Sequence, residues 1–110
     1  EFRQHFKVLI SVGDCAINGG IPAMRNMVPL QECYEEAFLN GPTVVNPSGK
    51  IPDDEEIPLL LNQVYPCHEV VHIDHFVPGC PPSADVLWTV IQALLEGRTP
   101  ELTGSLLRYD

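Results

Sequence analysis

Residues 7–13 read Lys-Val-Leu-Ile-Ser-Val-Gly, a short apolar run that ends at a glycine. Such a run is typical of a strand buried on both faces of a parallel sheet. A second candidate strand covers residues 69–76, Glu-Val-Val-His-Ile-Asp-His-Phe. Its apolar side chains would face packed layers, while His72 and Asp74 would share the opposite side. These two stretches decide the expected fold, because a turn and a helical pattern follow each of them.

Three stretches of the sequence have helical patterns, and the pattern is clearest in the last of them. A glycine-rich turn at residues 14–20 leads into a helical stretch, and a further helix is expected over 30–39, where Asn-Gly-Pro follows and ends it. The clearest helix covers 83–96, with prolines just before it and Gly97 just past its end. Its polar side chains form one narrow stripe. We therefore expect this helix to be buried on most sides.

The order of these elements is strand, helix, loop, strand, helix, which predicts an α/β fold with a parallel sheet. The 110 residues have room for one modest domain. Residues 41–69 hold five prolines and the acidic run at 53–56, which predicts a long proline-rich loop. Two strands do not form a stable sheet of this kind alone, so further strands are expected from outside these residues.

Composition limits the partners that the chain is expected to have. Six Lys and Arg stand against 15 Asp and Glu, a formal net charge of −9. Phosphate binding needs clustered cations, so we expect neither nucleic acid nor an anionic membrane surface as a partner. No apolar run approaches the roughly 20 residues of a membrane-spanning helix, and the first residues do not read as a signal peptide. A cytoplasmic protein is therefore expected.

Two of the four cysteines follow candidate strands. Cys15 comes two residues after the first strand and Cys80 four residues after the second. Parallel strands open their carboxyl ends onto the same edge, where ligands bind in such sheets, so the two thiols are expected at that edge. Cys80 would also lie at the N-terminus of the last helix, where the dipole favours a thiolate. No Cys-x-x-Cys pair is present, which argues against a self-contained zinc finger.

The remaining cysteines and the histidines are expected to have ordinary roles. Cys33 lies on the apolar face of its helix, which is typical of a buried structural thiol. Cys67 follows a proline in a loop and is expected to be a non-functional thiol. A zinc site is disfavoured because the three histidines of this region would not share one strand face; they are His68, His72 and His75.

Glycines flank both candidate ligands and leave backbone N–H groups free to approach sulfur. They are Gly13, Gly19, Gly20 and Gly79. From the residues alone, the spacing allows an iron–sulfur cluster without demanding one. A flavodoxin-like flavin-binding module with incidental cysteines and a small zinc-dependent interaction domain stay open as alternatives.

Two motifs resemble one protein family. Residues 12–26, VGDCAINGGIPAMRN, resemble the third-ligand segment of the small subunits of soluble NAD-reducing [NiFe] hydrogenases, and residues 77–85, VPGCPPSAD, resemble the fourth-ligand segment. The Pro-Gly-Cys-Pro-Pro part is shared with the cluster-bearing subunit of respiratory complex I and with F420-linked hydrogenases. A complex I-like or F420-linked small subunit is therefore the alternative, and the narrower first motif favours the NAD-linked group.

The resemblance implies a [4Fe–4S] cluster to which Cys15 and Cys80 contribute two of four thiolates, with the four glycines as cofactor-binding backbone. The family takes its other two ligands from a Cys-x-x-Cys segment that this sequence lacks. Residues 1–110 are thus expected to be the C-terminal half of a cluster-binding α/β domain. That domain would belong to a three-layer, flavodoxin-like parallel sheet with helices on both faces.

The resemblance also implies a function. The chain would relay electrons between the Ni–Fe site of a hydrogenase large subunit and flavin- and NAD-reducing subunits. The enzyme would convert H2 and NAD+ into H+ and NADH, and would be active only as a complex. No catalytic residue is expected in this chain, because electron relay needs ligation and insulation of the cofactor rather than acid–base groups. Whether FMN binds here stays open.

Overall fold

The computed structural model describes residues 1–107, which form two compact units. One unit combines residues 1–21 with the chain from Tyr65 onward, and the other consists of residues 22–64. Both candidate cysteine turns belong to the first unit.

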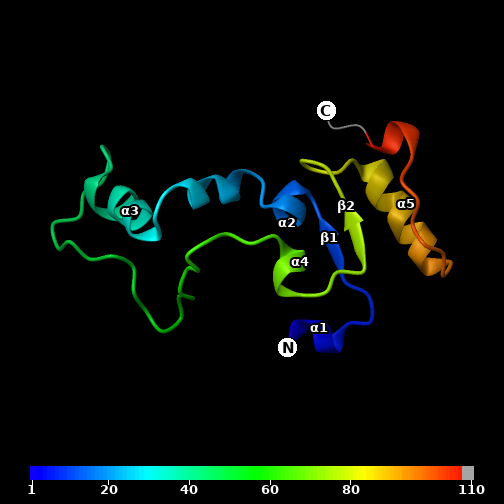
Figure 1. Ribbon diagram of the computed structural model, residues 1–110, viewed down its shortest axis with the longest axis horizontal. Helices are drawn as coiled ribbons and strands as arrows, with labels where there is room; N and C mark the ends of the chain where they lie inside the picture. Colours follow the sequence, from blue (N-terminus) through cyan, green and yellow to red (C-terminus); the bar gives the residue numbers. More distant parts are fainter. Residues whose placement is uncertain (108–110) are drawn as a thin grey trace. The chain divides into compact units, whose positions relative to one another are not determined.

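A two-stranded parallel sheet is the centre of the first unit (Figure 1). Strand β1 (Ile10–Val12) pairs with β2 (His75–Val77) in the register Ile10 to His75 and Val12 to Val77. The parallel pairing predicted from the sequence is confirmed, although each strand has only three residues. Helices and a parallel sheet together make the chain an α/β protein.

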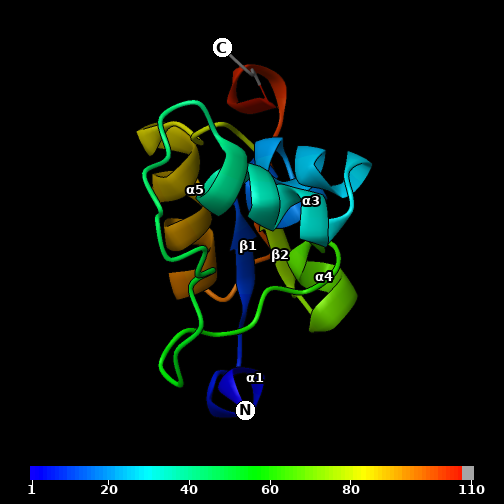
Figure 2. The same ribbon diagram turned by 90° about the vertical axis from the view of Figure 1, so that its left-hand side faces the viewer.

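Helices lie on both sides of this pair of strands (Figures 1 and 2). Helix α5 (Ala84–Leu95) packs beside β2, and the short helices α2 (Asp14–Asn18) and α4 (Cys67–Val70) lie on the other side. The one-turn helix α1 (Phe2–His5) precedes β1, and the 3₁₀ turn η3 (Gly104–Leu107) follows α5.

The hydrophobic core lies between β2 and one face of α5. Val77 is 1% exposed and packs against Val86 and Val90, which stand one helical turn apart. The hydroxyl of Ser83 caps α5 by accepting a hydrogen bond from the Val86 N–H at 3.3 Å. The helix predicted over 83–96 is thereby confirmed.

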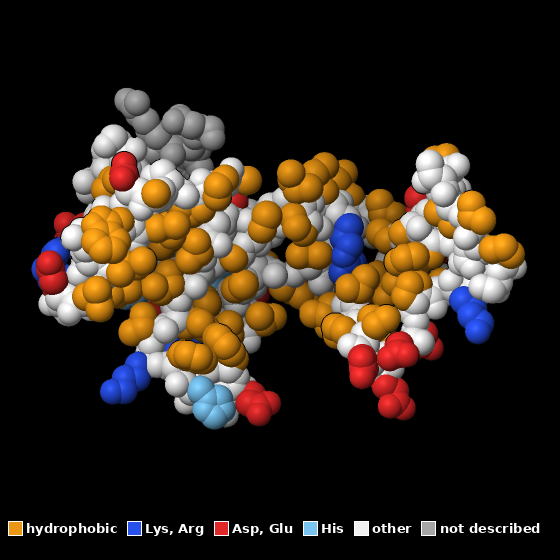
Figure 3. Space-filling view, turned by 180° about the vertical axis from the view of Figure 1, so that it is seen from behind, with side chains coloured by type: hydrophobic (Ala, Val, Ile, Leu, Met, Phe, Trp, Pro, Cys, Tyr) orange, Lys and Arg blue, Asp and Glu red, His pale blue; other side chains and the backbone are white. Residues whose placement is uncertain are grey.

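The prediction that α5 is buried on most sides is wrong within the part of the chain that the structure describes. Trp88 and Leu95 point away from the core, and Trp88 is 60% exposed. The reason is the small number of layers: the chain supplies β2 and the partly buried Leu102 and Leu106 as neighbours of the core, and these cover one helix face. Figure 3 shows hydrophobic side chains exposed on the surface of the molecule.

The predicted strand over 69–76 is wrong in its first half. Pro66 precedes helix α4, whose turn is closed by a 3.0 Å hydrogen bond from the Val71 N–H to the Cys67 carbonyl. Proline is well suited to the start of a helix, and this local effect overrides the β-branched residues that favoured a strand. Val70, expected to be packed, is exposed, whereas Ile73 is buried as expected.

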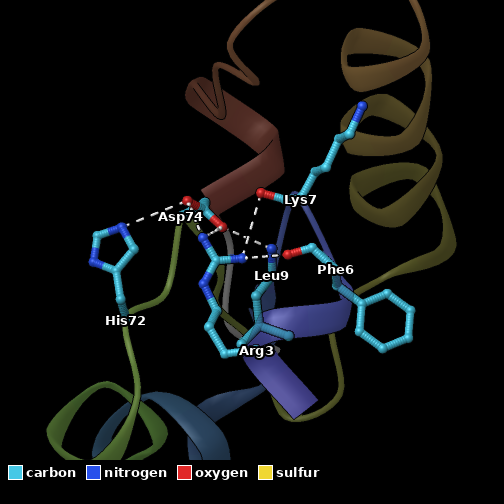
Figure 4. Close-up of polar contacts among 6 residues, drawn as sticks. All are labelled: Arg3, Phe6, Lys7, Leu9, His72 and Asp74. Carbon is cyan, nitrogen blue, oxygen red and sulfur yellow. Dashed lines mark hydrogen bonds and ion pairs between the residues drawn. The ribbon is translucent and has the colours of Figure 1, made fainter. Parts of the chain in front are cut away.

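The amino ends of the two strands are joined by the carboxylate of Asp74 (Figure 4). Its Oδ2 accepts the Leu9 N–H at 2.7 Å, and its own N–H donates to the Leu9 carbonyl at 2.9 Å. Arg3 pairs with the same carboxylate at 2.9 Å and also donates to the carbonyls of Phe6 and Lys7. The Leu9 N–H lowers the pKa of Asp74; desolvation opposes this shift, and the Arg3 charge adds to it.

The second unit begins with helical turns. The 3₁₀ segment η1 (Ile21–Met27) leads to α3 (Leu30–Glu35), which continues as the π-helical turn η2 (Glu36–Asn40). The helix predicted over 30–39 is therefore confirmed, with its last turn widened. Residues 59–61 form no helix.

Side-chain-to-backbone hydrogen bonds tie the ends of the second unit together. The Arg25 guanidinium donates to the carbonyls of Leu61 and Asn62, at 2.6 and 3.2 Å. The Asn26 side chain makes a two-way contact with Val64, at 2.9 Å to its carbonyl and 2.7 Å from its N–H. These contacts join residues 36 to 38 positions apart, so η1 and the end of the long loop are fastened to each other.

Candidate metal centre

Cys15 and Cys80 occupy equivalent positions after the two strands. The register pairs Val12 with Val77, and each cysteine is the third residue after its strand's last residue. The Gly13 N–H donates to the Val77 carbonyl at 2.8 Å, which carries the pairing one residue past β1. Both thiols are exposed. The sequence-based expectation that both cysteines follow strands at one edge of the sheet is confirmed.

The first turn places Cys15 inside helix α2 rather than in an irregular loop. Gly19 ends the helix in the left-handed conformation at φ 92°, and the Asn18 side chain accepts the Gly20 N–H at 2.8 Å. This fold-back brings Gly20 against Cys15: a Cβ on Gly20 would lie 2.9 Å from the Cys15 Sγ. Only a glycine leaves the thiol room at this point.

The second turn is built around Gly79. This residue is buried at φ 139°, and a Cβ here would lie 2.6 Å from the Cα of Pro82. The cap of α5 is Ser83, so Cys80 precedes the helix by several residues. The prediction that Cys80 lies at the helix N-terminus is wrong, because the two prolines after it are used to turn the chain and not to begin the helix.

Asp14 connects the two turns directly. Its N–H donates to the Gly79 carbonyl at 3.0 Å, and its Oδ1 accepts the Gly79 N–H at 3.0 Å. Each partner of this pair is the chain neighbour of a candidate ligand, Cys15 or Cys80. Sequence reasoning missed this role of Asp14, since the contact spans 65 residues and leaves no local pattern.

The other two cysteines are not in comparable turns. Cys33 lies in α3 of the second unit, half-buried, with its Sγ 4.0 Å from the Val28 carbonyl. Cys67 opens helix α4 and is also half-buried. The expected full burial of Cys33 is therefore only partly met.

The histidines of the 68–75 region are dispersed. His68 belongs to α4, with its ring edge-on to Phe76 at 5.9 Å, whereas His72 is exposed and lies 3.5 Å from Asp74. Among residues 1–107, no three His, Cys, Asp or Glu side chains are grouped so as to hold a metal ion. A metal centre on this chain would therefore combine its own donors with others.

The donor chemistry of the two turns suits a soft metal centre. Two exposed thiols stand on adjacent, hydrogen-bonded turns, and thiolates are the donors that Zn2+, Cu+ and iron–sulfur clusters prefer. Gly20 packs against the Cys15 Sγ and Gly79 is the chain neighbour of Cys80, so a glycine lies beside each cysteine. Two thiolates are half of the set that a four-iron cluster takes from protein.

Comparison with known proteins identifies the family. Residues 1–94 match the family described as NADH ubiquinone oxidoreductase, 20 Kd subunit. The chain belongs to this family. None of the helices that the structure describes is both long and apolar enough to cross a membrane.

Two relatives and one solved structure place the chain within the family. It is 48% identical over 112 residues to the delta subunit of the NAD-reducing hydrogenase HoxS of Cupriavidus necator, covering all of this chain and 53% of that subunit. It is 45% identical over 107 residues to a subunit of the F420-non-reducing hydrogenase of Methanothermobacter marburgensis, covering 97% of this chain and 34% of that one.

The structural likeness agrees with these identities. A chain from the crystal structure of a NAD+-reducing [NiFe]-hydrogenase in the H2-reduced state superposes with a TM-score of 0.91 at 43% identity, covering 99% of this chain and 61% of that chain. The resemblance drawn from residues 12–26 and 77–85 is thereby confirmed. This chain spans only part of each relative, about half of the HoxS subunit.

Proposed function

We propose that this chain is the cluster-binding part of the small subunit of a NAD-reducing [NiFe] hydrogenase. Cys15 and Cys80 supply two thiolates to a [4Fe–4S] cluster, and the backbone of the four flanking glycines lines it. The observation that carries the proposal is the pairing of two exposed thiols on hydrogen-bonded turns, in a chain 48% identical to the HoxS delta subunit.

The cluster, when bound, supplies one-electron transfer. The residues of this chain hold and insulate it. The Cys15 and Cys80 thiolates are ligands, and Gly20 and Gly79 allow the backbone to approach where a side chain would collide. No acid–base group of the chain is needed for this task.

The two remaining thiolates come from residues outside this sequence. Residues 1–110 then form the C-terminal half of a cluster-binding domain, in which the two strands belong to a larger, three-layer, flavodoxin-like parallel sheet. Two observations support this architecture: helices already lie on both sides of β1 and β2 (Figure 2), and α5 keeps an exposed apolar side that includes Trp88.

The partners follow from the same proposal. The large subunit with the Ni–Fe site would exchange electrons with the cluster. The cluster would in turn exchange electrons with the flavin- and NAD-reducing subunits. The complex would be cytoplasmic and would reduce NAD+ with H2 only when assembled. Flavin analysis of the purified small subunit, separated from the flavin-containing subunits, tests whether FMN binds this chain.

A second candidate is a hydrogenase small subunit with a different electron acceptor. The 45% identity to an F420-non-reducing hydrogenase favours it nearly as strongly. The cluster ligands would be the same in both cases. Reduction of NAD+ by H2 in the purified complex supports the first candidate, and reduction of other acceptors without NAD+ supports the second.

The experiment compares the four cysteines in the assembled complex. Cys15→Ser and Cys80→Ser should each abolish hydrogen-dependent NAD+ reduction and the corresponding electron paramagnetic resonance (EPR) signal, because a hard alkoxide is a poor substitute for a soft thiolate. NADH oxidation with artificial dyes should survive in both. Cys33→Ser and Cys67→Ser are the matched controls and should leave iron and sulfide content unchanged. Zinc alone in the wild type, or an unchanged signal in Cys15→Ser or Cys80→Ser, contradicts the proposal.

A further inference from the structure

Two aspartates join β1 and β2 in the same way at opposite ends of the strands. Beyond the carboxyl ends, Asp14 makes two hydrogen bonds with the backbone of Gly79, one through its own N–H and one through its carboxylate, both of 3.0 Å. Before the amino ends, Asp74 makes two such bonds with the backbone of Leu9, of 2.7 and 2.9 Å. In each case the aspartate's N–H donates to a carbonyl, and its carboxylate accepts the N–H of the same partner residue, 65 positions away. The two pairs of hydrogen bonds have the same form, but only Asp14 and Gly79 are chain neighbours of the candidate ligands Cys15 and Cys80.

From this arrangement we propose that Asp14 is a positioning residue for the metal centre. It fixes the separation and orientation of the Cys15 and Cys80 turns, so that both thiolates can bind one cluster. The inference rests on the proposed function and goes beyond it, because it assigns a role to a residue that is not a ligand.

The strands alone do not supply this constraint. Their pairing ends with the bond from the Gly13 N–H to the Val77 carbonyl, two residues before Cys15 and three before Cys80. Past this point, the reciprocal contact of Asp14 with Gly79 fastens the first turn to the second. Gly79 is buried, so its N–H would lose its partner if the carboxylate were removed, and buried N–H groups without partners are costly. The turn would then shift to pair that group elsewhere and would move Cys80 with it.

The test uses the full-length subunit in its assembled complex, with three variants. Asp14→Ala removes the side-chain acceptor. Asp14→Asn keeps an oxygen that can accept the Gly79 N–H and serves as the rescue variant. Asp74→Ala removes the equivalent acceptor at the other end of the strands and is the matched control for a loss of stability alone. Iron and sulfide content, the EPR spectrum per iron, the midpoint potential of the cluster and hydrogen-dependent NAD+ reduction are measured for each.

Asp14→Ala is expected to change the EPR line shape and the midpoint potential, and to lower hydrogen-dependent activity at least tenfold. Asp14→Asn should restore at least half of the wild-type activity with a wild-type spectrum. Asp74→Ala should lower the melting temperature while keeping the spectrum and the activity per iron. If Asp14→Ala does not assemble, Asp14→Ser takes its place, because the shorter hydroxyl does not reach as far as the carboxylate.

Three results overturn the inference. An unchanged spectrum and potential in Asp14→Ala would show that the turns keep their geometry without the side chain. Identical behaviour of Asp14→Ala and Asp74→Ala would make Asp14 a structural residue only, and a failure of Asp14→Asn to rescue would rule out the hydrogen bond as the cause. Failure of the proposed function looks different, since Cys15→Ser and Cys80→Ser would then keep their iron, and the inference would fall with it.

Discussion

The unit that carries Cys15 and Cys80 and the unit of residues 22–64 are stabilised by different forces. The first has a core in which Val77 and Val90 are at most 3% exposed. Within residues 22–64, all of which the structure describes, no residue is buried, and Val45 is 90% exposed. The second unit is held instead by side-chain-to-backbone contacts such as those of Arg25 and Asn26.

This difference indicates where the geometry of the metal centre comes from. The Cys80 turn follows β2, whose Val77 is buried in the apolar core, and β1 is paired with that strand. Apolar burial is the dominant stabilising term in folding. Hydrogen bonds exposed to water contribute only about 0.5–1.5 kcal/mol each, so residues 22–64 should open at lower free energy than the sheet. The same type of substitution, such as Gly→Ala or Val→Ala, should therefore lower stability more in the first unit than in the second.

The largest difference in stability between the two units is expected when a glycine is replaced by alanine. Gly79→Ala would drive a Cβ to within 2.6 Å of Pro82 at a left-handed φ of 139°, and should destabilise the first unit by more than about 3 kcal/mol. Gly49→Ala in the second unit also has a positive φ, 63°, but meets nothing within 4 Å and should cost only about 1 kcal/mol. Thermal melting of the full-length subunit measures both, and equal shifts would contradict the comparison.

A pair of valines tests the apolar core itself. Val77→Ala should destabilise the subunit by about 2 kcal/mol, because it removes buried methyl groups and leaves a cavity. Val45→Ala should change stability by less than about 0.5 kcal/mol, since the side chain is already in water. Urea unfolding monitored by tryptophan fluorescence reports on Trp88, which lies on the helix that packs against Val77. A large effect at Val45 would mean that residues 22–64 are packed more tightly than the structure describes.

Local patterns in the sequence were sufficient for part of the fold. The helix predicted over 83–96 matches α5 to within one residue at each end, because its apolar spacing, the prolines before it and Gly97 after it are encoded in neighbouring positions. The positions of Cys15 and Cys80 after the strands were also predicted from local patterns, although Cys80 does not lie at the N-terminus of the following helix as predicted.

What depends on contacts far apart in the sequence could not be predicted. The hydrogen bonds between Asp14 and Gly79 span 65 positions, and the hydrogen bond from Arg25 to the Leu61 carbonyl spans 36. Neither follows from periodicity or propensity. The first half of the strand predicted over 69–76 failed for a local reason instead: the β-branched residues there have strand propensity, but Pro66 and the turn at Cys67 begin a helix.

Removing the hydrogen bonds between Asn26 and Val64 in the second unit should have a smaller, local effect on stability. Asn26→Ala removes both contacts with Val64 and should lower local stability by about 1 kcal/mol, which would raise hydrogen exchange and proteolysis across residues 41–64. Asn62→Ala is the control, because the backbone rather than the side chain of Asn62 accepts the bond from Arg25. Melting of the core should be unchanged in both variants. A lower core melting temperature in Asn26→Ala would couple the two units.

The smallest effect concerns the Asp74 carboxylate, which joins the amino ends of the two strands. The pKa of Asp74 is lowered, chiefly by the Leu9 N–H and then by the Arg3 charge, so the ionised carboxylate favours the folded state. Its contribution is present above the ordinary aspartate pKa of about 3.9 and is lost as the pH falls through the lower, folded-state pKa. The difference in urea midpoint between wild type and Asp74→Asn should therefore be constant near neutral pH and shrink in acid. Because the Leu9 N–H is the larger cause, Arg3→Gln should keep most of this pH dependence. If Arg3→Gln removed it entirely, the ion pair rather than the backbone bond would be what joins the amino ends of the strands.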